Sequence, residues 1–169
     1  RPAAPVGLPF ADVSSSDWFY NDVRYVYEKG IMDGTGADRF SPNAPLTRAM
    51  IVTILYRMAG SPSVSGSSDF TDVAAGKWFA KAVAWAAANG IVNGYESGEF
   101  RPSQTITRQE MAAILYRYAQ YKGYDVTATG SLDSFTDKGS ASAWAQEAIK
   151  WAVGNGIMGG KENNLLDPK

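Results

Sequence analysis

The chain has 169 residues, of which 45% are hydrophobic and 20% charged, an ordinary composition for a folded protein of one or two domains. Its 16 basic and 17 acidic residues give a formal net charge of −1, which excludes a strongly basic surface for nucleic acid or an anionic membrane. Histidine and cysteine are absent, which excludes a Ser-His-Asp triad, a thiol nucleophile, a disulfide and the usual zinc sites. We expect neither a metal nor a cofactor.

The beginning of the chain is typical of a linker rather than of a targeting segment. Three of the first nine residues are proline, and no signal peptide is recognisable there. No apolar run approaches the 18 residues that a membrane-spanning helix needs. We interpret the sequence as a piece of a longer surface protein.

An internal repeat of 60 residues is the strongest signal. Residues 10–59 align with residues 70–119 without a gap, and 18 of the 50 aligned positions are identical. A fixed period of this length is typical of stacked supersecondary units. The shared motifs are Phe-x-Asp-Val at 10 and 70, Trp-Phe at 18 and 78, Gly-Ile at 30 and 90, Phe-x-Pro at 40 and 100, Thr-Arg at 47 and 107, and Ile-Leu-Tyr-Arg at 54 and 114.

A third copy begins at Phe135 and continues to Pro168, with one residue inserted relative to the second copy. Its Thr-Arg pair would be due beyond Lys169, and we expect the missing second helix of this repeat to follow there. The predicted organisation is a proline-rich linker at 1–9, repeats at 10–60, 70–120 and 135–169, and linkers rich in serine, glycine or threonine at 61–69 and 121–134.

Each repeat is predicted to fold as helix, loop and helix. Apolar residues at helical spacing predict a first helix over residues 18–29, 78–89 and 144–155. The glycine that follows each of these segments, at 30, 90 and 156, is typical of a helix C-terminus in the left-handed conformation. The proline of each Phe-x-Pro motif then excludes a helix in the loop.

The second helix is predicted to begin after Thr47 and Thr107 and to extend to about Ala59 and Ala119. Thr107 and Glu110 have the spacing of a capping box, in which each side chain accepts from the other residue's amide. The first repeat has Met50 at the glutamate position, so only the threonine half of the cap is expected there.

Together these motifs resemble the S-layer homology (SLH) family, in nearly the whole chain after residue 9. The resemblance implies an all-α fold, with tandem helix-loop-helix repeats forming a pseudo-threefold spindle around a central bundle of second helices. Because the third repeat lacks its second helix, we expect apolar residues such as Ile54, Leu55, Ile114 and Leu115 to be partly uncovered.

The resemblance also implies a function. It predicts a non-covalent anchor, outside the cell in the cell wall or S-layer, whose grooves bind a secondary cell-wall polymer attached to peptidoglycan. Family members commonly recognise a pyruvylated amino sugar. We expect no nucleic-acid or membrane partner. Any self-assembly is expected to go through the passenger protein, that is, the rest of the longer protein that this module anchors.

Arg48 and Arg108 are the principal candidate binding residues. Each is at the first position of a helix, where the macrodipole makes a cation unfavourable by about 0.3–1 kcal/mol. An arginine there needs a partner, and two alternatives are open. Free helix amides and a guanidinium could bind an external carboxylate or phosphate, or a carboxylate of the chain, such as Asp12 or Asp72, could form an internal salt bridge.

Other residues have two readings as well. The tryptophans could stack on a sugar or belong to the core, and the loop glycines could admit a ligand or form a tight turn. The aspartates of Phe-x-Asp are expected to cap or form turns, and Arg57 and Arg117 to pair with the helix macrodipole. The candidate glycan-binding residues are Arg48, Arg108, Gly34, Gly94, Tyr95, Trp18, Trp78 and Trp144, and the helix-capping residues are Thr47, Thr107 and Glu110.

A binding module is the preferred interpretation, and catalysis is not expected. Two alternatives are a calcium-dependent protein dock and part of a surface glycan hydrolase. The loop at 33–38 lacks the alternating oxygen ligands of a calcium site, and no pair of carboxylates with glycosidase spacing recurs among the repeats.

Overall fold

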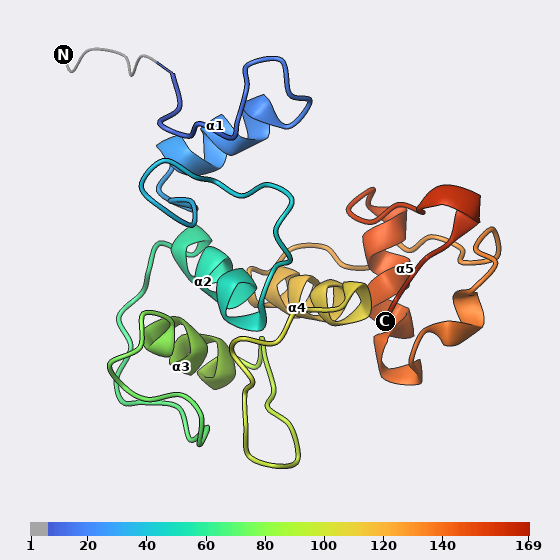
Figure 1. Ribbon diagram of the computed structural model, residues 1–169. Coiled ribbons are helices and arrows are strands. Elements are labelled where there is room, and N and C mark those ends of the chain that lie inside the picture. Colours follow the sequence, from blue (N-terminus) through green and yellow to red (C-terminus); the bar gives the residue numbers. More distant parts are fainter. Residues whose placement is uncertain (1–6) are drawn as a thin grey trace.

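The computed structural model describes residues 7–169, and the regular elements in this range are helices joined by long loops. The first helices of the three repeats are α1 (Tyr20–Glu28), α3 (Ala80–Ala88) and α5 (Gln146–Gly154), and the second helices are α2 (Arg48–Met58) and α4 (Arg108–Tyr121) (Figure 1). Three short 3-10 turns lie in the third repeat, at Lys138–Ser140, Ala143–Ala145 and Glu162–Asn164. The predicted all-α class is confirmed.

The helix boundaries differ slightly from the prediction. Each first helix begins two residues late, because the Trp-Phe or Trp-Ala pair lies in the turn that precedes it. Conversely, α4 continues to Tyr121, two residues beyond the predicted end. The predicted glycine ends are confirmed, since Gly30, Gly90 and Gly156 all have φ between 66° and 68°.

Both predicted helix caps are present. The Thr107 side chain accepts from the Glu110 amide, and the Glu110 carboxylate accepts from the Thr107 amide, which completes the capping box. Thr47 accepts from the Met50 amide, and methionine offers nothing in return. The second helix of the first repeat is therefore capped only in part.

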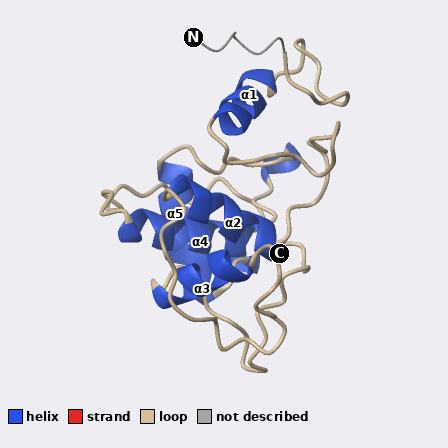
Figure 2. Cartoon of the chain, turned by 90° about the vertical axis from the view of Figure 1, so that its left-hand side faces the viewer, coloured by secondary structure: helices blue, strands red, loops and turns tan. Residues whose placement is uncertain are grey.

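The second helix of one repeat packs on the first helix of the next. α2 lies against α3 and α4 against α5, and Figure 2 shows these four helices gathered together while α1 stands apart. The Tyr56 ring meets Trp85 at a centroid distance of 5.5 Å, and Tyr116 meets Trp151 at the same distance. The repeats are thus joined through one recurring helix pair.

The core follows this arrangement. One apolar cluster combines α2, α3 and α4, a second combines α4 with α5, and a small separate cluster supports α1. The expectation of uncovered apolar residues is wrong for Leu55 and Ile114, which are 1% and 3% exposed because both lie in the cluster formed by α2, α3 and α4. Ile54 and Leu115 are half-buried.

Candidate functional site

The aspartate of each Phe-x-Asp motif holds the Phe-x-Pro loop of its own repeat. Asp12 accepts from the amides of Phe40 (2.9 Å) and Ser41 (2.8 Å), and Ser41 has a positive φ of 60°. Asp72 and Asp137 form the equivalent pairs of bonds, also with one left-handed residue each. The aspartates therefore stabilise a strained loop 28–30 residues away, and neither Asp12 nor Asp72 forms the salt bridge considered for the arginines.

These loop bonds also affect the charge of the aspartates. The Phe40 amide is the main reason that the pKa of Asp12 lies below its usual value, and the Ser41 amide adds to the effect. The Leu166 amide does the same for the pKa of Asp137. The loop amides therefore favour the charged form of both carboxylates.

The two motif arginines reach into the loop of the following repeat. Arg48 is 5% exposed, and it donates from Nε to the Phe100 carbonyl (2.9 Å) and from Nη2 to the Asn93 carbonyl (3.2 Å). Arg108 is half-buried and donates in the same way to the carbonyls of Leu166 (2.9 Å) and Gly159 (2.5 Å). Both arginines therefore fasten one repeat to the next, a role that sequence reasoning did not anticipate.

The amides at the start of the second helices are occupied too. The Arg48 and Ala49 amides donate to the carbonyls of Gln104 (2.9 Å) and Pro102 (3.0 Å), and the Gln109 amide donates to the Pro168 carbonyl (2.9 Å). The following repeat thus satisfies donors that helix termini usually leave open. A ligand at these positions would depend on side chains rather than on free helix amides.

A groove of about 210 Å³ lies beside Arg48, and we call it the second-repeat groove. It is formed by the loop and second helix of the second repeat, with one arginine from the first repeat and one tryptophan from the third. Its lining residues are Arg48, Val92, Asn93, Gly94, Tyr95, Glu110, Ala113, Ile114, Arg117 and Trp144.

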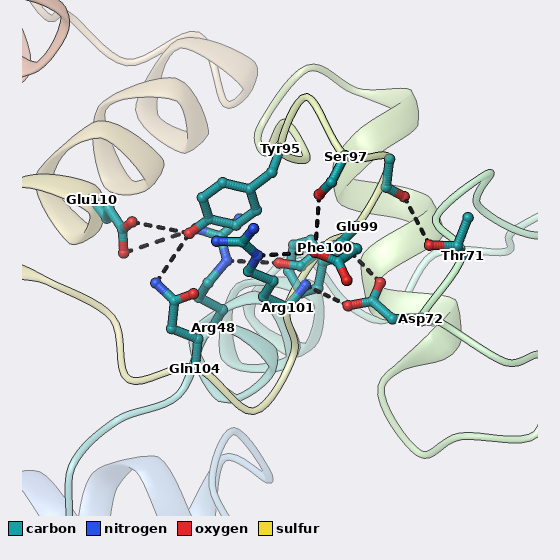
Figure 3. A network of polar contacts seen from close by, with 11 residues as sticks. Arg48, Thr71, Asp72, Tyr95, Ser97, Glu99, Phe100, Arg101, Gln104 and Glu110 are labelled. Carbon is teal, nitrogen blue, oxygen red and sulfur yellow. Dashed lines mark hydrogen bonds and ion pairs between the residues drawn. The ribbon is translucent and has the colours of Figure 1, made fainter.

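Glu110 and Tyr95 form the polar wall of this groove (Figure 3). The Tyr95 hydroxyl donates to Glu110 Oε1 (3.2 Å), and Arg48 Nη1 lies 3.9 Å from Glu110 Oε2. Two guanidiniums lie over the Tyr95 ring, that of Arg48 at 4.9 Å and that of Arg101 at 4.1 Å from the ring centroid. Glu110 therefore caps its own helix and also faces the arginine of the preceding repeat.

Arg117 is the functional candidate that sequence reasoning missed. Its side chain lines the second-repeat groove, and within residues 7–169 it has neither an ion pair nor a hydrogen bond. Burial, and to a smaller extent the positive charge of Arg48, lower the pKa of Arg117 from its usual value. The groove thus contains two guanidiniums and one carboxylate that is already engaged.

A second groove of about 360 Å³ occupies the equivalent place one repeat earlier, and we call it the first-repeat groove. Here Arg57 donates to the Ile31 carbonyl (3.1 Å) and pairs with Asp33 (2.9 Å). Arg57 therefore does more than interact with the helix macrodipole, because it also holds the loop of its own repeat. The lining residues are Ile31, Met32, Asp33, Gly34, Thr35, Phe40, Leu46, Met50, Thr53, Ile54, Arg57 and Trp78.

The three tryptophans proposed to stack on a sugar, Trp18, Trp78 and Trp144, lie on the surface. The alternative that they belong to the core is therefore wrong. Trp78 and Trp144 are 63% and 57% exposed, and each borders the groove of the preceding repeat. Trp18 is 89% exposed and lines neither groove, and Arg108 likewise lines neither. The sequence candidates are therefore divided between the grooves and other surfaces.

Gly34 and Gly94 line the two grooves for a reason of packing. A Cβ on Gly34 would lie 2.7 Å from the Phe10 ring, and one on Gly94 would overlap the Phe70 ring. Each glycine is thus required where the loop crosses the phenylalanine of Phe-x-Asp.

Two features that other kinds of protein have are absent from residues 7–169. None of the helices there is long and apolar enough to cross a membrane. No cluster of three or more acidic side chains suited to holding a metal ion occurs in the same range.

Comparison with known proteins gives one family and several relatives. The model of the S-layer homology domain matches residues 9–49, 69–112 and 134–169. An endoglucanase of Bacillus sp. (strain KSM-635) is 32% identical over 162 residues, which are 96% of this chain and 17% of that protein. The Surface-layer 125 kDa protein of Lysinibacillus sphaericus is 31% identical over 142 residues, 84% of this chain and 12% of that protein.

An amylopullulanase of Thermoanaerobacterium thermosulfurigenes is 32% identical over 164 residues, covering 95% of this chain and 8% of the enzyme. The chain thus spans less than a fifth of the length of these relatives. The enzymes are matched only through the region that contains the repeats.

Proposed function

Because this chain belongs to the S-layer homology domain family, whose members anchor proteins at the cell surface, we propose that it binds an anionic secondary cell-wall polysaccharide in the grooves between its repeats. The chain is an extracellular module of the anchoring type, and the family's repeats are not catalytic. The proposed ligand carries a pyruvate ketal on an amino sugar, and its carboxylate is the recognised anion.

The observation that supports this proposal is the composition of the second-repeat groove. Arg48 and Arg117 line it together, and Glu110 is the single carboxylate in its lining. A surplus guanidinium in a half-buried groove favours a carboxylate, because it offers charge and paired donors at once. The exposed indole of Trp144 at the edge offers a flat apolar face against which a sugar ring can lie.

A co-sedimentation experiment tests this function. The chain is mixed with purified wall sacculi, and with sacculi from which mild acid has removed the secondary polymer. We expect pelleting only with the intact sacculi, and competition by soluble pyruvylated polymer but not by polymer without pyruvate. Equal pelleting with both kinds of sacculi would overturn the proposal and favour a protein dock.

Two tryptophan variants provide a matched pair for the same assay. Trp144→Ala removes an exposed indole at the second-repeat groove, whereas Trp18→Ala removes one that lines neither groove. We expect at least a tenfold weaker affinity for Trp144→Ala and an unchanged affinity for Trp18→Ala. Similar losses in both variants would place the binding surface elsewhere.

A further inference from the structure

Most lining positions of the two grooves are equivalent in successive repeats, although Arg48 of the first repeat lines only the second-repeat groove. Loop residues 31–35 correspond to 91–95, and the lining residues of α2 correspond to those of α4. One of their differences is the charge at the loop position occupied by Asp33 in the first groove and Asn93 in the second. Each of these residues lines its groove together with the equivalent arginine, Arg57 or Arg117.

Asp33 neutralises the arginine of the first-repeat groove. Its carboxylate lies 2.9 Å from Arg57 Nη2, and Arg57 Nη1 is bonded to the Ile31 carbonyl. No other cation lines this groove within the described residues. Its remaining wall is largely apolar and includes Met32, Met50 and the indole of Trp78.

Asn93 leaves the arginine of the second-repeat groove without a counter-charge. Asparagine is uncharged, and its backbone carbonyl is used by Arg48. Glu110 already accepts from the Tyr95 hydroxyl and the Thr107 amide. Glu147, in an adjoining hollow with Arg117, accepts from the Tyr116 hydroxyl (3.0 Å) and forms no ion pair with Arg117.

We propose that the two grooves bind different parts of the glycan, which rests on the proposed function. Arg117 of the second-repeat groove binds the anionic group, whereas the first-repeat groove binds a neutral sugar against Trp78. The identity of the residue at positions 33 and 93 selects between the two. Arg48 is a positioning residue, because its Nε and Nη2 hold the loop and only Nη1 faces the groove.

Exchanging the residue types at positions 33 and 93 tests, by calorimetry, whether these positions select the groove that binds the anion. The probes are a synthetic pyruvylated N-acetylhexosamine and the same sugar without pyruvate. For the wild-type chain we expect one site for the pyruvylated probe. Asn93→Asp should weaken that site at least tenfold, and Asp33→Asn should free Arg57 and raise the stoichiometry from one to two.

Arg117→Gln and Arg57→Gln are a matched pair of variants that tests which arginine binds the anionic group. We expect Arg117→Gln to abolish the preference for the pyruvylated probe over the neutral one, and Arg57→Gln to leave that preference unchanged. Thermal unfolding followed by circular dichroism shows whether each variant is folded. Loss of the preference in Arg57→Gln, or its retention in Arg117→Gln, would overturn the inference.

The outcomes separate the two proposals. If the wild-type chain binds neither sacculi nor either probe, the proposed function fails. If it binds the pyruvylated probe but Arg117→Gln and the exchange at positions 33 and 93 have no effect, the function stands and the assignment of the grooves is wrong.

Discussion

The junction between the first and second repeats and the junction between the second and third use the same contacts. In both, a helix-start arginine donates from Nε and Nη2 to two carbonyls of the next loop. In both, the next amide donates to the carbonyl of the loop proline, and a tyrosine of the second helix packs on a tryptophan. The backbone geometry of the joint is therefore repeated.

The two junctions differ in the aromatic residues around these contacts. Arg48 is buried between the rings of Tyr95 and Phe100, each 4.9 Å away. Arg108 is half-buried, because Lys161 and Leu166 stand where the second repeat has Tyr95 and Phe100. Non-motif positions thus set how deeply an otherwise identical junction is buried, and equivalent variants on the two sides can test what this burial contributes.

The largest effect is expected at the paired tryptophans. Trp85→Ala and Trp151→Ala each remove a buried indole, and such changes cost about 3–5 kcal/mol. Trp85 also meets the rings of Tyr118 (6.4 Å) and Tyr121 (5.5 Å), so its loss should be the greater of the two. Urea unfolding of both variants measures the difference, and a larger loss for Trp151→Ala would contradict it.

Among the motif arginines, Arg48→Ala should lower the free energy of unfolding more than Arg108→Ala. Arg48→Ala leaves the buried Phe100 carbonyl and the part-buried Asn93 carbonyl without their donor, which should cost about 2–4 kcal/mol of unfolding free energy. Arg108→Ala should cost about 1–2 kcal/mol, since water can replace the lost bonds at a half-buried site. Urea midpoints at constant slope test both values, and equal costs would show that burial does not matter here.

Much of the local structure was predictable because it depends on neighbouring residues. The threonine caps at 47 and 107 and the glycine ends of the first helices follow from spacing within a few residues. The apolar spacing placed the helices to within two residues. The start was misjudged because the Trp-Phe pair fits the helical period but lies in a turn.

The roles of the arginines were not predictable in the same way. Arg48 finds its acceptors 45 and 52 residues along the chain, in the loop of another repeat. Arg57 and Arg117 come from identical Ile-Leu-Tyr-Arg motifs. They differ because the fold places the charged Asp33 beside Arg57, whereas the equivalent loop residue of the second repeat is uncharged. The repeat alignment does show Asp33 opposite Asn93, but without the fold nothing connects that position to the arginines.

A smaller effect is expected from pH. Because loop amides lower the pKa of Asp12 and Asp137 in the folded state, their contribution to stability is present above the usual carboxyl pKa. It should be lost as the pH falls through the lowered pKa values. Urea unfolding at pH 7 and pH 3 should therefore show a smaller pH dependence for the Asp12→Asn, Asp137→Asn double variant than for the wild-type chain, and an unchanged dependence would contradict this account.

The smallest effect is a gain at the incomplete cap. Met50→Glu places a carboxylate at the position that Glu110 has in α4, where it can accept from the Thr47 amide as Glu110 does from that of Thr107. A completed capping box and an acidic residue in the first turn should add about 0.5–1 kcal/mol. Urea unfolding measures the gain, with Met50→Gln as the control that can cap without charge. If the charge near the helix start matters, glutamate should stabilise more than glutamine. If Met50 instead contributes mainly by packing in the first-repeat groove, both variants should be less stable than the wild-type chain.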